Sequence, residues 1–222
     1  MAATVLAVAA AASAALAEGP GSVSTTLHNL SARGPGEVRA VSETEVCKFC
    51  HIPHSAVVAA PLWGHALSTA ASYAVPDVKG PGGALRPGGQ PDGASRLCLS
   101  CHDGTVALGD LGRKRGTVPM AGAQKLGAGR RGFLGTDLSG SHPISIEMPV
   151  TDPAADDDAD VGLRPLQAVQ ADREVRLDRD GKIQCTTCHD PHADRYHVEG
   201  QVPRFWVKPT VEEVCLVCHQ LR

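Results

Sequence analysis

The sequence predicts a mostly irregular chain with short α-helices, in which side chains alone do not fill the interior. Glycine and proline are frequent, with 24 Gly and 16 Pro in 222 residues, which is above the usual proportion but below that of disordered proteins. Aromatic residues are rare, because the chain has three Phe, two Trp and two Tyr. The third observation is a five-residue motif that occurs four times, and it indicates what fills the interior.

The repeated motif is C-x-x-C-H, and its four copies use all eight cysteines. In a helical turn, residues i, i+3 and i+4 share one face, so two thiols and an imidazole can point at one flat ligand. The thiols bind a haem as thioethers, and the histidine becomes the proximal iron ligand. The copies are Cys47, Cys50 and His51; Cys98, Cys101 and His102; Cys185, Cys188 and His189; and Cys215, Cys218 and His219. The sequence therefore predicts four covalently attached c-type haems that form the core.

Other uses of the C-x-x-C spacing fit less well. A single pair could form half of a zinc ribbon or a thioredoxin-like redox pair. Neither use requires histidine at the next position, and here histidine follows all four pairs. We therefore favour haem c over zinc. Because few large side chains remain to build a core, we expect folding to depend on haem binding.

Residues 1–17 predict a secretory signal peptide. They contain an alanine-rich apolar run, and Ala15-Leu16-Ala17 fits a small-x-small cleavage site, although no Lys or Arg precedes the run as is usual. The alternative is a buried N-terminal helix. The run is too short to cross a membrane, so we expect an exported protein without a membrane span, extracellular or, alternatively, periplasmic.

The mature chain begins with a polar arm, residues 18–41, and continues as one tetrahaem domain, residues 42–222. Residues 42–45 have the form of a capping box, which predicts a helix from Ser42 that carries the first motif. Ser95 is a candidate cap for the second helix. Residues 175–183 predict a hairpin with an Asp-Gly turn. A second capping box at residues 210–213 predicts the last helix.

The motifs alternate in design. The first and third read C-x-x-C-H-x-P-H, and the second and fourth read C-L-x-C-H. This alternation predicts two dihaem units, residues 42–110 and 175–222, joined by a long loop region. That region has a basic part with Arg113, Lys114, Arg115, Lys125, Arg130 and Arg131, and an acidic part with Asp152, Asp156, Asp157, Asp158 and Asp160. We interpret both parts as solvated loops, and the alternative is complementary docking patches.

The second axial ligand of each iron separates an electron carrier from an enzyme. Methionine is a poor candidate, because only Met120 and Met148 remain besides the first residue. Six histidines lie outside the motifs, namely His28, His54, His65, His142, His192 and His197. This supply favours bis-histidine iron, whose closed coordination supports outer-sphere electron transfer.

His54 and His192 each lie three residues after a proximal histidine. Neither can reach the opposite face of the same iron, but each can reach a different iron within about 10 Å, which would draw two haems together. Pro143 holds His142 in an extended backbone and favours it as a ligand. His28 lies on the arm, where an ordinary exposed histidine is the alternative.

The two remaining histidines are weaker candidates for the second axial ligand. His65, near Trp63, is either a ligand or a packing contact at a haem edge. We expect His197 to face solvent.

Six segments, taken in order, resemble a known family, the tetrahaem c-type cytochromes with paired C-x-x-C-H motifs, including those that form extracellular cytochrome filaments, or nanowires. They span positions 28 to 219 and are His28-Asn-Leu-Ser; CKFCHIPH followed by Pro61-Leu-Trp63; Ser95-Arg-Leu-CLSCHDGTVALG; Gly135-Thr-Asp-Leu-Ser-Gly-Ser-His142-Pro-Ile-Ser; QCTTCHDPH; and EVCLVCH. The resemblance implies His28, His54, His142 and His192 as distal ligands. It also implies that one of them is given to a haem in the next subunit, and its place on the arm makes His28 the candidate.

We therefore expect multihaem electron transfer without bond-making chemistry, in a filament subunit that exchanges electrons with other redox proteins or extracellular acceptors. We expect no nucleic-acid partner. One alternative is a discrete periplasmic shuttle or the electron-input subunit of a reductase. Another is a multihaem oxidoreductase, which would require an open iron, and no further motif or catalytic cluster supports it.

Overall fold

The computed structural model describes residues 22–79, 85–112, 116–148 and 161–221. Their helices and strands are short and are separated by long irregular segments, so the predicted fold class is confirmed. Within these ranges no helix is long and apolar enough to cross a bilayer. The predicted signal peptide, Arg113 to Arg115 and the acidic residues at 152–160 lie outside the described residues.

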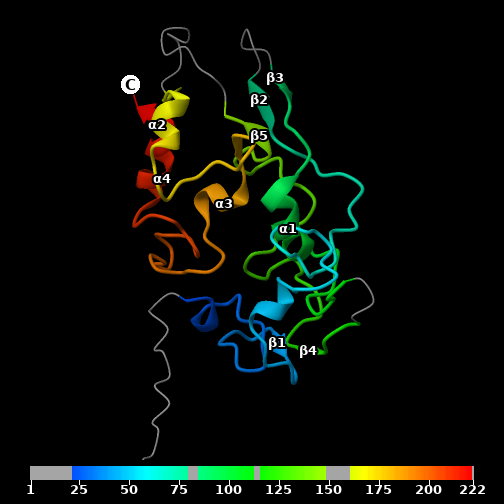
Figure 1. Ribbon diagram of the computed structural model, residues 1–222. Coiled ribbons are helices and arrows are strands. Elements are labelled where there is room, and N and C mark those ends of the chain that lie inside the picture. Colours follow the sequence, from blue (N-terminus) through cyan, green and yellow to red (C-terminus); the bar gives the residue numbers. More distant parts are fainter. Residues whose placement is uncertain (1–21, 80–84, 113–115, 149–160, 222) are drawn as a thin grey trace, which may run out of the picture.

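Each C-x-x-C-H motif begins in a helix (Figure 1). The first cysteine pair lies in or directly after a 3-10 helix, and the other three lie in α-helices. The helices are η1 (Val23–Thr25), η2 (Cys47–Phe49), α1 (Gly93–His102), α2 (Leu166–Gln170), α3 (Cys185–Cys188) and α4 (Val211–Cys218). The cysteines of each pair are therefore one helical turn apart, as binding to one flat ligand requires.

Four small antiparallel sheets, each of two strands, tie distant parts of the chain together. Three of them use a strand from the stretch that joins the two predicted dihaem units. The pairs are β1 (Arg39–Ala40) with β4 (Met120–Ala121), β2 (Asp77–Lys79) with β3 (Leu85–Pro87), β5 (Ile146–Glu147) with β7 (Lys182–Ile183), and β6 (Val161–Leu163) with β8 (His219–Leu221). In register, Arg39 faces Ala121, Ile146 faces Ile183 and Leu163 faces His219. The joining stretch is therefore more than a loop.

The predicted start of the first helix is wrong. The Glu43 carboxylate accepts hydrogen bonds from the backbone N–H groups of Thr44 and Glu45 at 2.9 and 3.0 Å, and it also pairs with Lys48. These bonds close a local turn, so Ser42 caps nothing and only η2 forms. Side chains that bond their own backbone compete with helix formation in this way.

The other predicted caps have opposite outcomes. At α4 the prediction is confirmed, because Thr210 Oγ1 accepts a hydrogen bond from the N–H of Glu213 at 3.1 Å. At α1 it is wrong, because Asp92 occupies the N-cap position. Ser95 lies inside α1 and is fully buried.

The predicted hairpin is half right. Its turn forms, since Asp178 O accepts a hydrogen bond from Gly181 N at 3.0 Å, and Gly181 has a φ of 74° that a side chain would disfavour. Asp178 N also donates to Lys182 O across the turn at 3.0 Å, but no strand forms directly before the turn, and the return strand β7 pairs with β5. The strand that leads into the third motif is therefore anchored by the joining stretch.

Two small apolar clusters lie among the buried residues that the structure describes. One lies between α2, α4 and the β5–β7 sheet and contains Met148, Val169, Val175, Ile183, Val214 and Val217. The other lies at the opposite end of the molecule (Figure 1) and contains Ala40, Phe49, Leu108 and Met120. Met120 and Met148, the methionines weighed as axial ligands, are both buried in these clusters.

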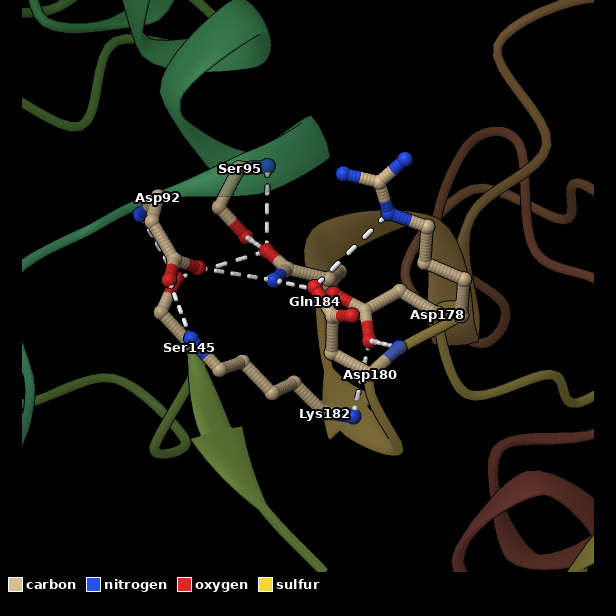
Figure 2. A network of polar contacts seen from close by, with 8 residues as sticks. Asp92, Ser95, Ser145, Asp178, Asp180, Lys182 and Gln184 are labelled. Atoms are coloured by element: carbon tan, nitrogen blue, oxygen red, sulfur yellow. Dashed lines mark hydrogen bonds and ion pairs between the residues drawn. The ribbon is translucent and has the colours of Figure 1, made fainter.

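A buried polar network joins α1 to α3 (Figure 2), and Gln184, which is 1% exposed, lies at its centre. Its Oε1 accepts hydrogen bonds from the N–H and hydroxyl of Ser95. Its Nε2 donates to Asp92 Oδ1 and Asp178 Oδ2, both at 2.9 Å. Ser95 Oγ also accepts from the N–H of Cys185 at 3.0 Å. The network therefore fixes the start of α3 against α1, and with it the second and third motifs.

Replacing Gln184 by Leu should lower the free energy of unfolding by roughly 2–4 kcal/mol, because Ser95 and two carboxylates would lose a buried partner. Urea unfolding of the haem-loaded protein measures the change. Gln201, which is exposed, gives the matched control Gln201→Leu, for which we expect little change. Equal effects of the two substitutions would contradict the role assigned to Gln184.

The same network should make stability depend on pH. Burial alone would raise the pKa of Asp92, but hydrogen bonds from Lys182 and Gln184 outweigh it and hold this pKa below its usual 3.8. A carboxylate with a lowered folded-state pKa stabilises the fold above the unfolded-state pKa, and this contribution is lost as pH falls through the folded-state pKa. The stability difference between wild type and Asp92→Asn should therefore shrink as pH falls from about 6 to about 3. As a control, the stability difference between wild type and Glu45→Gln, a substitution of an exposed residue, should not change over this pH range.

Candidate haem-binding sites

All eight cysteines are free thiols, and none forms a disulfide. In the described ranges, no three His, Cys, Asp or Glu side chains converge as they would around a metal ion bound by the protein alone. A structural zinc site needs four such ligands around one point. The donor groups here fit a broad ligand that separates the sulfurs from the imidazole nitrogen.

The sulfur atoms of neighbouring motifs lie close together. The thiols of Cys98 and Cys185 form a hydrogen bond, which raises the pKa of Cys98 and lowers that of Cys185 to about 7. Burial, and then the nearby Cys50, raises the pKa of Cys101 to about 12. Burial, and then the cysteines of the fourth motif, likewise raises the pKa of Cys188 to about 12. The anchors of the first and second, second and third, and third and fourth motifs are thus neighbours.

Three of the four motif histidines have a ring nitrogen fixed by a backbone carbonyl. The contacts run from His51 Nδ1 to Pro61 O at 2.8 Å, from His102 Nδ1 to Gly132 O at 2.6 Å and from His189 Nδ1 to Arg204 O at 2.9 Å. A carbonyl oxygen only accepts, so Nδ1 carries the hydrogen and Nε2 keeps its lone pair. Histidines that bind metals are usually held by this arrangement.

The carbonyl that binds His102 belongs to a glycine, Gly132. Gly132 has a φ of 79°, and a Cβ atom there would lie 3.1 Å from the His102 ring. Both the backbone conformation and the close approach exclude larger residues. The loop at residues 130–133 is therefore shaped around this imidazole.

The fourth motif histidine differs from the others. His219 Nδ1 is buried and has no hydrogen-bond partner among the described residues. Burial, and then the neighbouring His142, lowers the pKa of His219, so its ring is neutral at neutral pH. A cavity of about 480 Å³ lies beside it, lined by Arg164, Leu216, His219 and Gln220, and its volume is in the range of cofactor sites.

Three predicted distal histidines lie opposite motif histidines of their own chain. The ring centroids are 5.9 Å apart for His28 and His102, 6.0 Å for His51 and His192, and 6.2 Å for His142 and His219. An imidazole nitrogen binds a metal at about 2 Å and its ring centre lies about 1.1 Å further, so two imidazoles on opposite faces of one iron have centroids about 6 Å apart. The residues present therefore fit bis-histidine haem iron.

His28 is placed by the chain that surrounds it. Its Nδ1 contacts Pro191 O at 3.1 Å, and its ring stacks on Phe205 at 4.1 Å. Burial, and then the nearby His102, lowers the pKa of His28 to about 4, which keeps the ring neutral as a metal ligand must be. Its place on the arm makes His28 the candidate for donation to the next subunit, and in the single chain its ring lies opposite that of His102.

His142 and His192 are exposed and are oriented by different groups. His142 Nδ1 contacts the carbonyl of Pro143 at 2.9 Å. His192 Nδ1 lies 3.5 Å from a carboxylate oxygen of Asp190. In both cases Nδ1 is the oriented atom, as it is in three of the motif histidines.

At the third site, the ring of His189 meets that of Trp206, at 5.0 Å between centroids. His54, the remaining predicted distal ligand, lies exposed in the turn that follows η2.

His65 and His197 bond to the backbone instead. His65 is 1% exposed, and its Nδ1 and Nε2 contact the carbonyls of Ala66 and Ala107 at 2.8 and 3.0 Å. Its Nε2 also lies 3.6 Å from the sulfur of Cys101. Of the two alternatives for His65, the packing contact beside the second motif is the one that fits. His197 Nδ1 contacts Val202 O at 2.8 Å.

The described residues of the basic part bond within the chain. Arg131 forms an ion pair with Glu199, Arg130 donates to Gly122 O at 3.0 Å, and Lys125 donates to Thr105 O.

Comparison with known proteins adds one match, since residues 179–221 match the family described as "Doubled CXXCH motif". This segment contains the third and fourth C-x-x-C-H motifs. A search of the curated proteins returned no match. The doubled motif supports a multihaem c-type cytochrome with covalently bound haem c. Cytochromes of this kind are generally electron carriers and are typically exported.

Sequence reasoning missed several residues that build the sites. Gln184 orients two motifs, and Trp206 packs against His189. The carbonyl acceptors belong to the backbone, so no side-chain pattern marks them. A signal for Trp206 did exist, because the two tryptophans of the chain each follow a C-x-x-C-H-x-P-H motif.

Electron paramagnetic resonance of the oxidised, haem-loaded protein should give two types of low-spin signal, because the highest g value depends on the angle between the two imidazole planes. That angle is 20° for His51 and His192, but 66° for His28 and His102 and 74° for His142 and His219. We expect a rhombic signal from the first site and signals with a large highest g value from the second and fourth. Substitution of His192 should remove the rhombic signal selectively. A single signal type for all sites would contradict the observed ring pairs.

Proposed function

We propose that the protein transfers electrons through four closely spaced bis-histidine haems and performs no bond-making chemistry. The observation that carries this proposal is the spacing of the three histidine pairs, about 6 Å between ring centroids in each. Bound haem iron supplies reversible one-electron exchange. The residues of the chain hold, orient and enclose it.

The cysteines and histidines have separate roles in this proposal. Two cysteines of each motif tether the porphyrin edge, so that the carrier stays bound in both oxidation states. The motif histidine and its opposite histidine close both axial positions, which leaves no site for a substrate. Low pKa values keep His28, His189 and His219 neutral, so that no proton competes for the lone pair.

Close spacing of the carriers is supported by the cysteine anchors. The sulfurs of Cys98 and Cys185 lie side by side, which would place the attachment points of the second and third haems next to each other. His192 belongs to the segment of the third motif but lies opposite His51 of the first. A short separation between carriers favours rapid electron hopping.

Mass spectrometry and spectroscopy of protein from a host that attaches haem c test this function. We expect four covalent haems per chain and low-spin iron in every oxidation state. Fewer than four haems would contradict the proposed count. A five-coordinate, high-spin ferric signal would indicate an open iron and favour an oxidoreductase.

We propose further that the protein acts outside the cell as a filament subunit, in which one distal histidine is given to a haem of a neighbouring subunit. The resemblance to cytochromes that form extracellular filaments supports this proposal. A ligand bond across the interface would make the haem chain continuous.

Electron micrographs of the native, haem-loaded protein should show uniform filaments, and a structure of these filaments should show an iron whose sixth ligand comes from a neighbouring subunit. A sample that is uniformly monomeric, with all irons low-spin, would contradict the filament and favour a discrete periplasmic shuttle or the electron-input subunit of a reductase.

A further inference from the structure

Residues 61–64 hold the first motif histidine by a set of contacts that recurs elsewhere in the chain. Three hydrogen bonds join this segment to the first motif, from His51 Nδ1 to Pro61 O at 2.8 Å, from Ile52 N to Leu62 O at 2.9 Å and from Gly64 N to Cys50 O at 2.8 Å. The indole ring of Trp63 meets the His51 ring edge-on, with centroids 6.0 Å apart and planes at 89°. The imidazole is thus held at Nδ1 and on one side.

Residues 204–207 hold the third motif histidine in the same way. The corresponding bonds run from His189 Nδ1 to Arg204 O at 2.9 Å, from Asp190 N to Phe205 O at 2.8 Å and from Val207 N to Cys188 O at 3.1 Å. Trp206 meets the His189 ring edge-on at 5.0 Å and 77°. In both segments the tryptophan pairs with the histidine as an antiparallel bridge. We call residues 61–64 and 204–207 the proximal clamps.

Each proximal clamp depends on one residue in the left-handed region. Leu62 has a φ of 63° and Phe205 a φ of 62°, which side chains other than glycine rarely adopt. In an extended strand, successive carbonyls point in opposite directions. The left-handed residue reverses this alternation, so that Pro61 O and Leu62 O both face the first motif. The same geometry turns Arg204 O and Phe205 O toward the third.

The second and fourth sites have only parts of this arrangement. His102 is bonded to a glycine carbonyl, and its ring lies near that of His28. At the fourth site, Arg164 N donates to Cys218 O at 2.7 Å and Leu163 pairs with His219 in the β6–β8 sheet, but His219 Nδ1 has no hydrogen-bond partner in the described part of the chain. Among the described residues, the full clamp, with a carbonyl at Nδ1 and a tryptophan against the ring, is therefore found at the two C-x-x-C-H-x-P-H motifs.

We propose that the proximal clamps are positioning devices, in which Leu62 and Phe205 aim the carbonyls and Trp63 and Trp206 fix the imidazole planes. A carbonyl that accepts from Nδ1 makes the imidazole a stronger donor, and a stronger donor stabilises ferric iron. The clamps thereby lower the reduction potentials of the first and third haems. This inference rests on the proposed haem binding.

Leu62 offers a matched pair of variants, because its side chain is 45% exposed and the effect of its backbone can be tested by itself. Leu62→Val disfavours the left-handed conformation, since valine is β-branched, whereas Leu62→Gly permits it. The readout is a spectroelectrochemical titration of the haem-loaded variants. For Leu62→Val we expect one of four potentials to rise, with about a tenfold change in the ferrous to ferric ratio, or about 59 mV for one electron. For Leu62→Gly we expect all four potentials to stay unchanged.

The outcomes separate the clamp from haem binding itself. Mass spectrometry reports the haem count independently of the potentials. Four haems with equal shifts in both variants, or with no shift in Leu62→Val, would overturn the proposal and leave the proposed function standing. A shift of all four potentials would also overturn it, because the clamp acts on one site.

A second variant decides the matter if Leu62→Val does not take up haem. Trp63→Leu keeps the backbone and removes the ring that faces His51. We expect the highest g value of the first site alone to change in electron paramagnetic resonance, because the imidazole plane is no longer fixed. An unchanged spectrum would overturn the role of Trp63.

Discussion

The proposed haem binding depends on one geometric constraint, which is that two imidazoles from distant parts of the chain lie about 6 Å apart, as they do at three of the four motif histidines. His51 meets His192, His28 meets His102 and His142 meets His219. None of these pairs is local, so the backbone must be held at many separate places. The four small sheets, the buried Gln184 network and the carbonyls bonded to Nδ1 are the means by which it is held.

This constraint explains why such short elements form a defined structure. The apolar clusters around Val169 and Phe49 are small, and helices of four to ten residues are marginal on their own. Polar contacts therefore carry more of the positioning than in an ordinary domain, and bound haem would add the missing apolar surface. Ser95 and Gln184, which are almost fully buried, hydrogen-bond each other between the second and third motifs. A shift of either residue would therefore displace two motifs at once.

The sequence was sufficient for features encoded within a few residues. The C-x-x-C-H spacing, the Thr210 cap and the Asp-Gly turn are of this kind, and the structure has all three. The sequence was insufficient where a residue distant in the chain determines the partner of a side chain or strand. Ser95 resembles a cap but bonds Gln184, β7 pairs with β5, and His28 lies against His102 and Phe205. No pattern of neighbouring residues predicts such partners. The predicted cap at Ser42 fails for a local reason, because the Glu43 side chain bonds to the same stretch of backbone instead.

The pairing of His51 with His192 has a consequence for the organisation of the chain. The alternation of motifs predicts two dihaem units, and the paired proximal clamps show that the first and third sites share one design. Yet a histidine from the second unit lies opposite the motif histidine of the first, and Ser95 of the first unit bonds Gln184 of the second. The first unit lies opposite a histidine held by the second, and the buried network joins the two, so the two units do not form separate sites.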